Sequence, residues 1–242
     1  RLADRGDGAP RPRQASDQRR RVITLVRHTP SSNRRIRRAV ATALAAAAIA
    51  ALGLAPASGL AADSVTVTFA SGTSWTVEDA DPGVGPSLAL PGAAQHVCLN
   101  AGAPATCPGD ATLFGWVGGG WSADLSAIPG ATWIWAPGID AATTPADSDT
   151  YRFVRTISVP GAPQSGTAWV AADDGAEVFV NGTSAGSATG QYDLAALDIT
   201  ALLVQGDNEI VVRGANNANC GGPCTYQSNP AGVVFGGSIS YV

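Results

Sequence analysis

The chain has 242 residues, with 15 basic residues against 19 acidic ones and a formal net charge of −4 at pH 7. After Ala62 only three arginines stand against 16 acids, so the formal net charge of this part is −13. Such a body repels phosphate backbones and anionic lipid surfaces, which argues against nucleic acid as a partner.

The first 62 residues are predicted to contain an export signal. Four arginines between residues 34 and 38 precede an uncharged, alanine- and leucine-rich run, which Pro56 ends. This order predicts a signal peptide over residues 34–62, and no membrane insertion after processing, because a spanning helix needs about twenty apolar residues. Residues 1–33 lack periodicity and are interpreted as a non-structural or spurious extension.

Four cysteines follow the predicted signal peptide, and export makes disulfides their expected state. Three connectivities are possible. Local pairing of Cys98 with Cys107 and of Cys220 with Cys224 is favoured, because each pair brackets a loop that contains glycine or proline. A zinc site is the alternative, but the spacings fit zinc poorly and His96 adds little.

Short strands are predicted along most of residues 63–242. Apolar and polar side chains alternate with a period of two at residues 65–69 and 74–77. Residues 78–120 are rich in glycine, proline and alanine and are predicted to form long loops with two short strands. These two short strands are 95–99 and 113–117. Further strands are predicted at residues 131–135, 151–159, 167–172, 176–180, 209–213, 233–235 and 238–241.

Turn residues separate these strands. Asp173-Asp174-Gly175 is predicted as a hairpin turn, and Asn181-Gly182 supplies the left-handed backbone of a tight turn. Asp198 can cap a brief helix within residues 197–204, the one helix candidate after the signal peptide. Gly206-Asp207-Asn208 is predicted to turn the chain again.

Strands this short, at intervals of about ten residues, predict one all-β antiparallel sandwich domain over residues 63–242. Several short pieces follow one another in a characteristic order: Ser74-Trp75, 131–135, 151–155, 170–175, 178–182, 198–200, 206–210 and 229–232. In these pieces the chain resembles the galactose-binding-like jelly-roll family, found in many carbohydrate-binding modules. The resemblance implies two facing sheets, ligands held by end loops or a concave face, and often a structural calcium ion.

Two sets of side chains are candidates for binding a sugar. Trp116 and Trp121 flank a triple glycine, where a flexible loop would leave an indole free to stack on a sugar ring; burial is the alternative. Asn216, Asn217 and Asn219 form the densest amide cluster, and amides offer the donors and acceptors that hydroxyl recognition requires. Loop capping is the alternative for these amides, and Tyr192 is a candidate neighbour.

Asp173 and Asp174 are candidate calcium ligands, or carboxylates that accept hydrogen bonds from sugar hydroxyls. Their alternative is a turn without a ligand. No serine nucleophile has a suitable motif near His96, so no catalytic residue is predicted.

The sequence therefore predicts a secreted, extracellular, non-catalytic binding module whose partner is a carbohydrate or cell-surface glycan. One alternative is a structural or adhesive β-sandwich at the cell surface without a sugar ligand. The other is an extracellular glycoside hydrolase or esterase.

Overall fold

The computed structural model describes residues 63–79, 89–99, 107–115, 120–122, 124–140, 150–217, 224–225 and 228–242. All of these belong to one compact unit, residues 58–242. The predicted signal peptide and N-terminal extension lie outside the described residues. In the described part of the chain, no helix is long and apolar enough to cross a membrane.

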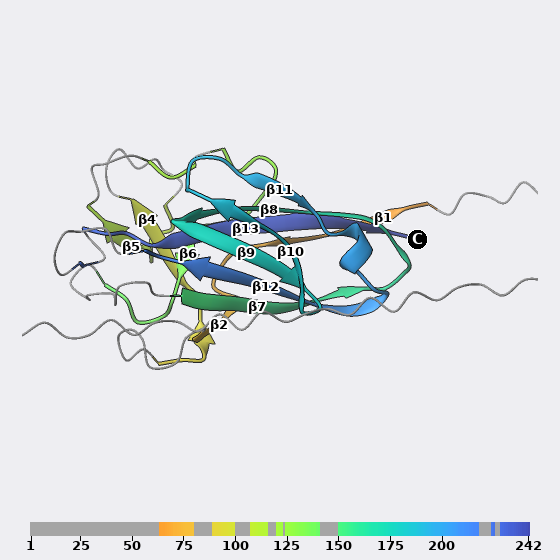
Figure 1. Ribbon diagram of the computed structural model, residues 1–242, viewed down its shortest axis with the longest axis horizontal. Coiled ribbons are helices and arrows are strands. Elements are labelled where there is room, and N and C mark those ends of the chain that lie inside the picture. Colours follow the sequence, from red (N-terminus) through yellow and green to blue (C-terminus); the bar gives the residue numbers. More distant parts are fainter. Residues whose placement is uncertain are drawn as a thin grey trace, which may run out of the picture. The chain divides into compact units, whose positions relative to one another are not determined.

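The described residues form two β-sheets and one 3-10 turn, η1 (Thr200–Leu202), and they contain no α-helix. The seven-stranded sheet has the order β11 (Ala195–Asp198), β8 (Pro163–Asp173), β13 (Gly232–Tyr241), β6 (Ile134–Trp135), β4 (Gln95–Leu99) and β5 (Thr112–Phe114), and β1 (Val65–Ala70) also pairs with β13. The six-stranded sheet has the order β10 (Thr183–Thr189), β9 (Gly175–Val180), β12 (Gly206–Ala215), β7 (Thr150–Val159), β2 (Thr76–Asp79) and β3 (Gly92–Ala93). Every described pair is antiparallel except β4 with β5 (Figure 1).

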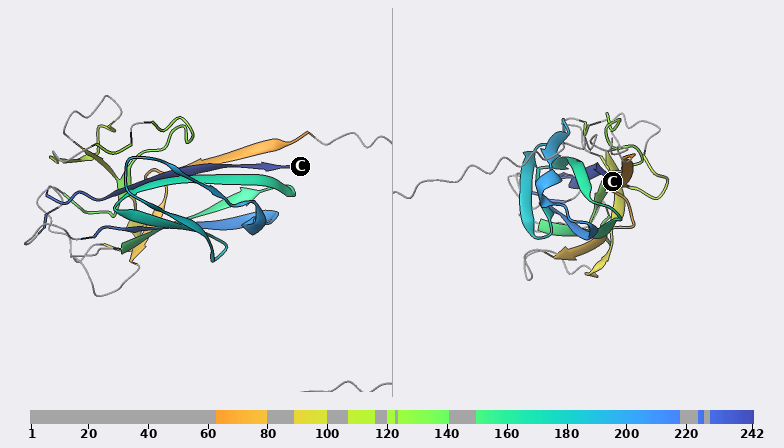
Figure 2. Two further views of the ribbon diagram at one scale, coloured as in Figure 1. Left: turned by 45° about the horizontal axis from the view of Figure 1, so that its top comes forward. Right: turned by 90° about the vertical axis from the view of Figure 1, so that its right-hand side faces the viewer.

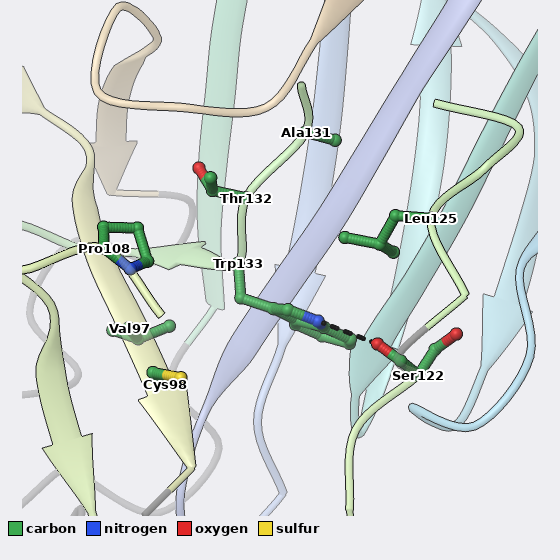
Figure 3. Close-up of a pocket in the computed structure, with 8 residues that line it drawn as sticks. All are labelled: Val97, Cys98, Pro108, Ser122, Leu125, Ala131, Thr132 and Trp133. Atoms are coloured by element: carbon green, nitrogen blue, oxygen red, sulfur yellow. Dashed lines mark hydrogen bonds between the residues drawn. The ribbon is translucent and has the colours of Figure 1, made fainter. Parts of the chain in front are cut away.

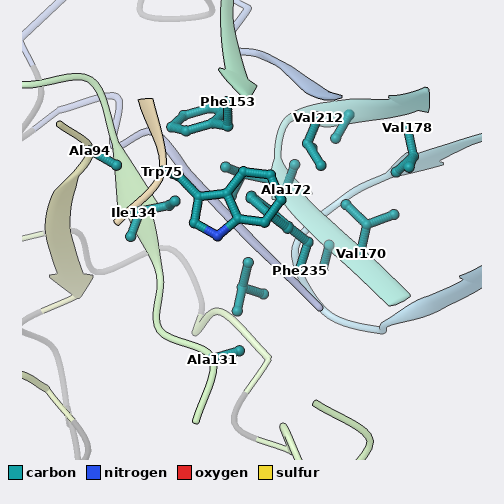
Figure 4. Close-up of a cluster of buried hydrophobic side chains, with 14 of the residues drawn as sticks. Trp75, Ala94, Ala131, Ile134, Phe153, Val170, Ala172, Val178, Val212 and Phe235 are labelled. Carbon is teal, nitrogen blue, oxygen red and sulfur yellow. The ribbon is translucent and has the colours of Figure 1, made fainter. Parts of the chain in front are cut away.

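The side chains that point inward from the two sheets form one hydrophobic core. Trp75, Phe153 and Phe235 meet at its centre (Figure 4), where the Trp75 ring stands edge-on to Phe235 at 4.5 Å between centroids. Phe153 of β7 lies 6.2 Å from Phe235 of β13, so this contact joins the two sheets. The all-β class is therefore confirmed, with two sheets packed on a shared aromatic core.

Most predicted strands are present, and several boundaries differ. β4 has the predicted bounds, whereas the strand predicted at 113–117 is the shorter β5. β13 is one strand where two were predicted. The helix predicted within 197–204 is wrong in extent: β11 runs to Asp198, and only η1 follows. The Asp198 side chain does accept a hydrogen bond from the Thr200 backbone N–H at 2.9 Å.

The two predicted hairpin turns have different outcomes. Asn181 and Gly182 have φ angles of 52° and 78° and join β9 to β10, which confirms the tight turn. The segment Asp173-Asp174-Gly175 is not a hairpin, because β8 and β9 belong to different sheets. The chain crosses from one sheet to the other at this point, and the Asp173–Asp174 peptide bond is cis.

The predicted disulfide between Cys98 and Cys107 is confirmed, with 5.9 Å between the Cα atoms. Cys224 is disulfide-bonded as well, while its predicted partner Cys220 lies outside the described residues. Close to the first disulfide, His96 Nδ1 lies 2.8 Å from a carboxylate oxygen of Asp110. The Cys98–Cys107 disulfide and the contact of His96 with Asp110 hold residues 107–110 beside β4.

A loop segment covers part of the outer face of the seven-stranded sheet, and we call residues 120–122 and 124–133 the cover segment. Gly232 and Gly236 of β13 alternate with the inward-facing Val233 and Phe235 and therefore face outward. A Cβ atom at Gly236 would lie 2.7 Å from the Ile128 side chain, and one at Gly232 would lie 2.8 Å from Trp121. The cover segment thus approaches β13 where the strand has no side chains.

We predict that Gly236→Ala destabilises the protein by about 1–3 kcal/mol, the usual effect of overpacking a closed site. The added methyl would meet Ile128 and also the Phe69 carbonyl oxygen at 2.8 Å, and a backbone atom cannot easily move. Urea denaturation followed by tryptophan fluorescence measures the change in the free energy of unfolding.

Gly109→Ala is the matched control, because a Cβ at Gly109 would meet nothing within 4 Å. It should change stability by less than about 0.5 kcal/mol. Equal effects of the two substitutions would show that the cover segment does not pack closely on β13.

Candidate functional site

An open groove lies between the cover segment and the loop that joins β10 to β11. Its volume is about 470 Å³. The side chains that line it are two aromatic rings, two carboxylates, two hydroxyls and two aliphatic groups, from Trp169, Tyr192, Asp124, Asp193, Ser122, Ser126, Ala127 and Leu194.

The aromatic rings are accessible for a structural reason. Trp169 alternates along β8 with the buried Ala168 and Val170, so its indole points to the outer face of the sheet. Its cross-strand neighbours are Gly236 on β13 and Ala196 on β11, both too small to cover the indole. Tyr192 is 59% exposed.

Backbone hydrogen bonds hold the two walls of the groove together. The Ser122 N–H donates to the Gln191 carbonyl oxygen at 2.7 Å, which links the cover segment to the β10–β11 loop. The Gly190 N–H donates to the Asp174 carbonyl oxygen at 2.6 Å, which ties that loop to the crossing between the sheets. Within the cover segment, Asp124 Oδ1 accepts a hydrogen bond from the Ser126 N–H at 3.0 Å. The groove is therefore built before a ligand arrives.

This set of groups suits a ligand with both an apolar face and many hydroxyls. An aromatic ring offers a flat apolar surface, and a phenol or indole adds a polar edge. Carboxylates accept hydrogen bonds, and the serine hydroxyls can both donate and accept. A small number of polar groups beside apolar surface is the usual composition of a ligand site.

A second, smaller cavity of about 240 Å³ lies on the other side of the cover segment (Figure 3). Its lining includes Val97, Cys98, Leu125 and Trp133, and Trp133 Nε1 donates to the Ser122 carbonyl oxygen at 3.4 Å. Trp133 is only 9% exposed. With mainly aliphatic walls and no carboxylate, this cavity offers a hydroxylated ligand fewer partners than the groove.

The structure places Trp121 in the packing of the cover segment. Its ring stacks on Trp133 at 4.5 Å between centroids and meets the edge of Phe114 at 6.1 Å. Its Nε1–H donates to Asp173 Oδ2 at 2.9 Å. These contacts account for Trp121 without a ligand, and its sugar-binding role stays a prediction. Trp116 lies outside the described residues.

Asn216 and Asn217 of the predicted amide cluster lie at the crossing between the sheets and do not line the groove. The Asn217 N–H donates to Asp174 Oδ2 at 2.7 Å, and Asn229 Nδ2 donates to Asn216 Oδ1 at 3.3 Å. Asn216 is 1% exposed, and its Nδ2 has no hydrogen-bond partner in the described part of the chain. Asn219 lies outside that part. Of the predicted ligand-binding residues that the structure describes, Tyr192 alone lines the groove.

Calcium binding by Asp173 and Asp174 stays a prediction. One carboxylate oxygen of each residue already accepts a hydrogen bond, from Trp121 and from Asn217 respectively. Among the described residues, no three His, Cys, Asp or Glu side chains lie close enough to hold a metal ion. Carboxylates with two lone-pair-bearing oxygens each can still accept a further partner.

Sequence reasoning missed Trp169, Asp124 and Asp193 as groove residues. Trp169 lies in a predicted strand, between Ala168 and Val170. Because successive side chains of a strand point to opposite faces, this position could have indicated that Trp169 faces away from these two residues. The two aspartates lie in loops 69 residues apart, and no local pattern brings them together.

Burial raises the pKa of Asp173 to about 6, and the nearby carboxylate of Asp174 adds to the rise, while the hydrogen bond from Trp121 opposes it. The folded protein therefore holds a proton on Asp173 at pH values where the unfolded chain, with an ordinary pKa of 3.8, has lost it.

The fold and the groove define an all-β protein with two facing sheets and one open, acidic and aromatic groove. No protein-family model matches the chain, and no curated protein does. Similar solved structures include an FMN-binding β-glucuronidase from Facaelibacterium prausnitzii L2-6, with a TM-score of 0.37 and 19% identity over 72% of this chain and 23% of that chain.

Another similar structure is a Streptomyces avermitilis α-L-rhamnosidase complexed with L-rhamnose, with a TM-score of 0.35 and 25% identity over 43% of this chain and 10% of that chain. A third is an uncultured Clostridium β-glucuronidase, with a TM-score of 0.30 and 16% identity over 37% of this chain and 19% of that chain. The matched part is less than a quarter of each of these chains. Likeness at this level assigns no function.

We predict that the stability of the protein relative to Asp173→Asn falls as the pH rises from about 4 to about 6.5, by up to about 3 kcal/mol. The sign follows from the raised pKa: the native state binds more protons than the unfolded state between pH 3.8 and about 6. Above that window the cost of a buried charge is fully present, and below it the cost is absent. Urea denaturation at a series of pH values measures the difference.

The Asp173→Asn variant is the reference for the unmodified protein, because its side-chain amide oxygen can still accept the Trp121 hydrogen bond and the amide does not titrate. All other titrating groups are common to both proteins and cancel in the difference. A difference that stays constant across the pH range would show that the Asp173 carboxyl is not desolvated.

Proposed function

We propose that this chain is a secreted, non-catalytic carbohydrate-binding module and that the sugar binds in the groove. The observation that carries the proposal is a pair of aromatic rings, the exposed Tyr192 and the half-buried Trp169, set beside carboxylates and hydroxyls in one preformed depression. The proposed fold within the all-β class is the jelly roll of the galactose-binding-like family.

Ring stacking is the main source of affinity in this proposal. A sugar ring presents C–H groups on its faces and hydroxyls around its edge. Trp169 and Tyr192 can pack against such a face, while Asp124, Asp193 and Ser126 accept or donate hydrogen bonds at the rim. Because both walls are fixed by backbone hydrogen bonds, little ordering entropy opposes binding.

The groove carboxylates support binding rather than hydrolysis. A glycosidase needs one carboxylic acid with a raised pKa to protonate the leaving group. Hydrogen bonds from Ser126 instead lower the pKa of Asp124, so this side chain stays ionised near neutral pH. His96 is the histidine that follows the predicted signal peptide. It belongs to β4, pairs with Asp110 and does not line the groove.

Secretion is part of the proposal. The disulfide between Cys98 and Cys107, and the disulfide state of Cys224, fit an oxidising compartment. The export signal predicted in the sequence supplies the route. Calcium, if it binds, would act as a structural ion and not in the groove.

We predict that Tyr192→Ala and Trp169→Ala each weaken binding to oligosaccharides about three- to tenfold, the usual effect of losing one aromatic contact. Pull-down on insoluble polysaccharides identifies the ligand, and isothermal titration with its oligomers measures the dissociation constant. Circular dichroism confirms that each variant folds, which matters most for the partly buried Trp169.

Val204→Ala is the matched control, because Val204 is 50% exposed and lies in the turn after η1, away from the groove lining. It should bind as tightly as the unmodified protein. If no polysaccharide retains the protein, or if the three substitutions have equal effects, the groove is not a sugar site.

A further inference from the structure

The groove has a charge as well as a shape. Asp124 lies on the wall made by the cover segment, and Asp193 lies on the wall made by the β10–β11 loop. Both are exposed, and among the residues that the structure describes no basic side chain lines the groove. A ligand between these walls therefore faces a carboxylate on either side. A negatively charged ligand would find no described basic side chain in the groove with which to pair.

The arginines of the domain are all on the other sheet. Arg152 and Arg155 belong to β7, and Arg213 belongs to β12, both strands of the six-stranded sheet. Arg152 pairs with Glu78 at 2.9 Å, and Arg155 lies over the Trp75 ring at 6.0 Å and donates to Ser74. The sequence after residue 62 contains no lysine.

The hydrophobic core separates these arginines from the groove, because facing sheets pack about 10 Å apart and the groove lies on the outer side of its sheet. None of the three described arginines, Arg152, Arg155 and Arg213, can therefore reach the groove by a change of rotamer. A sugar that carries a carboxylate or sulfate would meet repulsion from the walls without a compensating partner.

We propose that the groove selects polysaccharides of amino sugars whose amines are free and protonated, with the ammonium groups paired to Asp124 and Asp193 while the sugar rings stack on Trp169 and Tyr192. This inference rests on the proposed function and specifies its ligand class. A hydrogen bond in which both partners are ionised is roughly twice as strong as a neutral one. The carboxylates thus convert a general sugar site into one for cationic sugars.

The test compares three ligands on the full chain, by isothermal titration at about pH 5.5, where an amine is protonated. They are a fully deacetylated glucosamine hexamer, its fully N-acetylated counterpart and a galacturonate hexamer, which are cationic, neutral and anionic. The deacetylated hexamer should bind at least tenfold more tightly than the acetylated one, and the galacturonate hexamer should not bind. The preference should shrink as salt rises from about 0.05 to about 0.5 M.

The double variant Asp124→Asn with Asp193→Asn should lose the preference, so that the deacetylated and acetylated hexamers bind it with similar dissociation constants. The matched control is Asp207→Asn with Glu209→Gln, which removes two exposed charges from β12 on the other sheet. This control should retain the preference. If both double variants lose it equally, the attraction comes from the overall negative charge of the protein and the inference is wrong.

The remaining outcomes separate the inference from the proposed function. Binding of the acetylated hexamer as tightly as the deacetylated one, or tight binding of galacturonate, would overturn the selectivity for amino sugars and leave a sugar-binding module. Failure of all three hexamers and of a wider panel of polysaccharides to bind would overturn both.

Discussion

The close packing of the cover segment on β13 is the contact on which the rest of the structure depends. It is possible only because Gly232 and Gly236 leave the outer face of the strand without side chains, so that Trp121 and Ile128 lie directly on the backbone. Outward-facing Val234, which would otherwise be solvated, is fully buried as a result. One sheet therefore buries both of its faces along this strand, which is unusual for an antiparallel sheet.

The groove is a consequence of where this covering stops. Ile128 covers β13 at Gly236, and Trp169 is the neighbour of that glycine on β8. Beyond β8 only the short β11 follows, and its Ala196 adds little bulk beside the indole. The ring is thus flanked by a wall on one side and a loop on the other, with small residues next to it in the sheet. A larger residue at either neighbouring position would fill the floor of the groove.

The parts of the fold that the sequence predicts are those set by local patterns. β7 carries a long apolar–polar alternation, and Asn181-Gly182 is a dipeptide that a tight turn strongly favours. β10 was missed because Thr183–Thr189 contains only small and polar residues, and its pairing with β9 decides its conformation. The hairpin predicted at Asp173 was wrong because local turn chemistry does not say which sheet the chain enters next.

The site was harder to predict than the fold for a physical reason. A groove forms between segments that are distant in the sequence, and only tertiary packing brings Asp124 and Asp193 to its two walls. The tryptophans chosen from the sequence were those beside glycine, on the argument that flexibility exposes a ring. In the structure Trp121 is held by Trp133 and Asp173, whereas Trp169 is accessible from a regular strand.

The charged side chains are distributed unevenly between the two sheets. Arg152 pairs with Glu78, and Arg155 donates to Ser74 and lies over the Trp75 ring, so these two arginines have partners on the six-stranded sheet or beside it. In the groove, Asp124 accepts a hydrogen bond from the Ser126 N–H, which keeps it ionised, and no described arginine forms an ion pair with Asp124 or Asp193. An unpaired exposed carboxylate contributes little to stability, because water solvates it well. The charges of Asp124 and Asp193 therefore add little to the stability of the protein, and a cationic ligand is the partner that we propose for them.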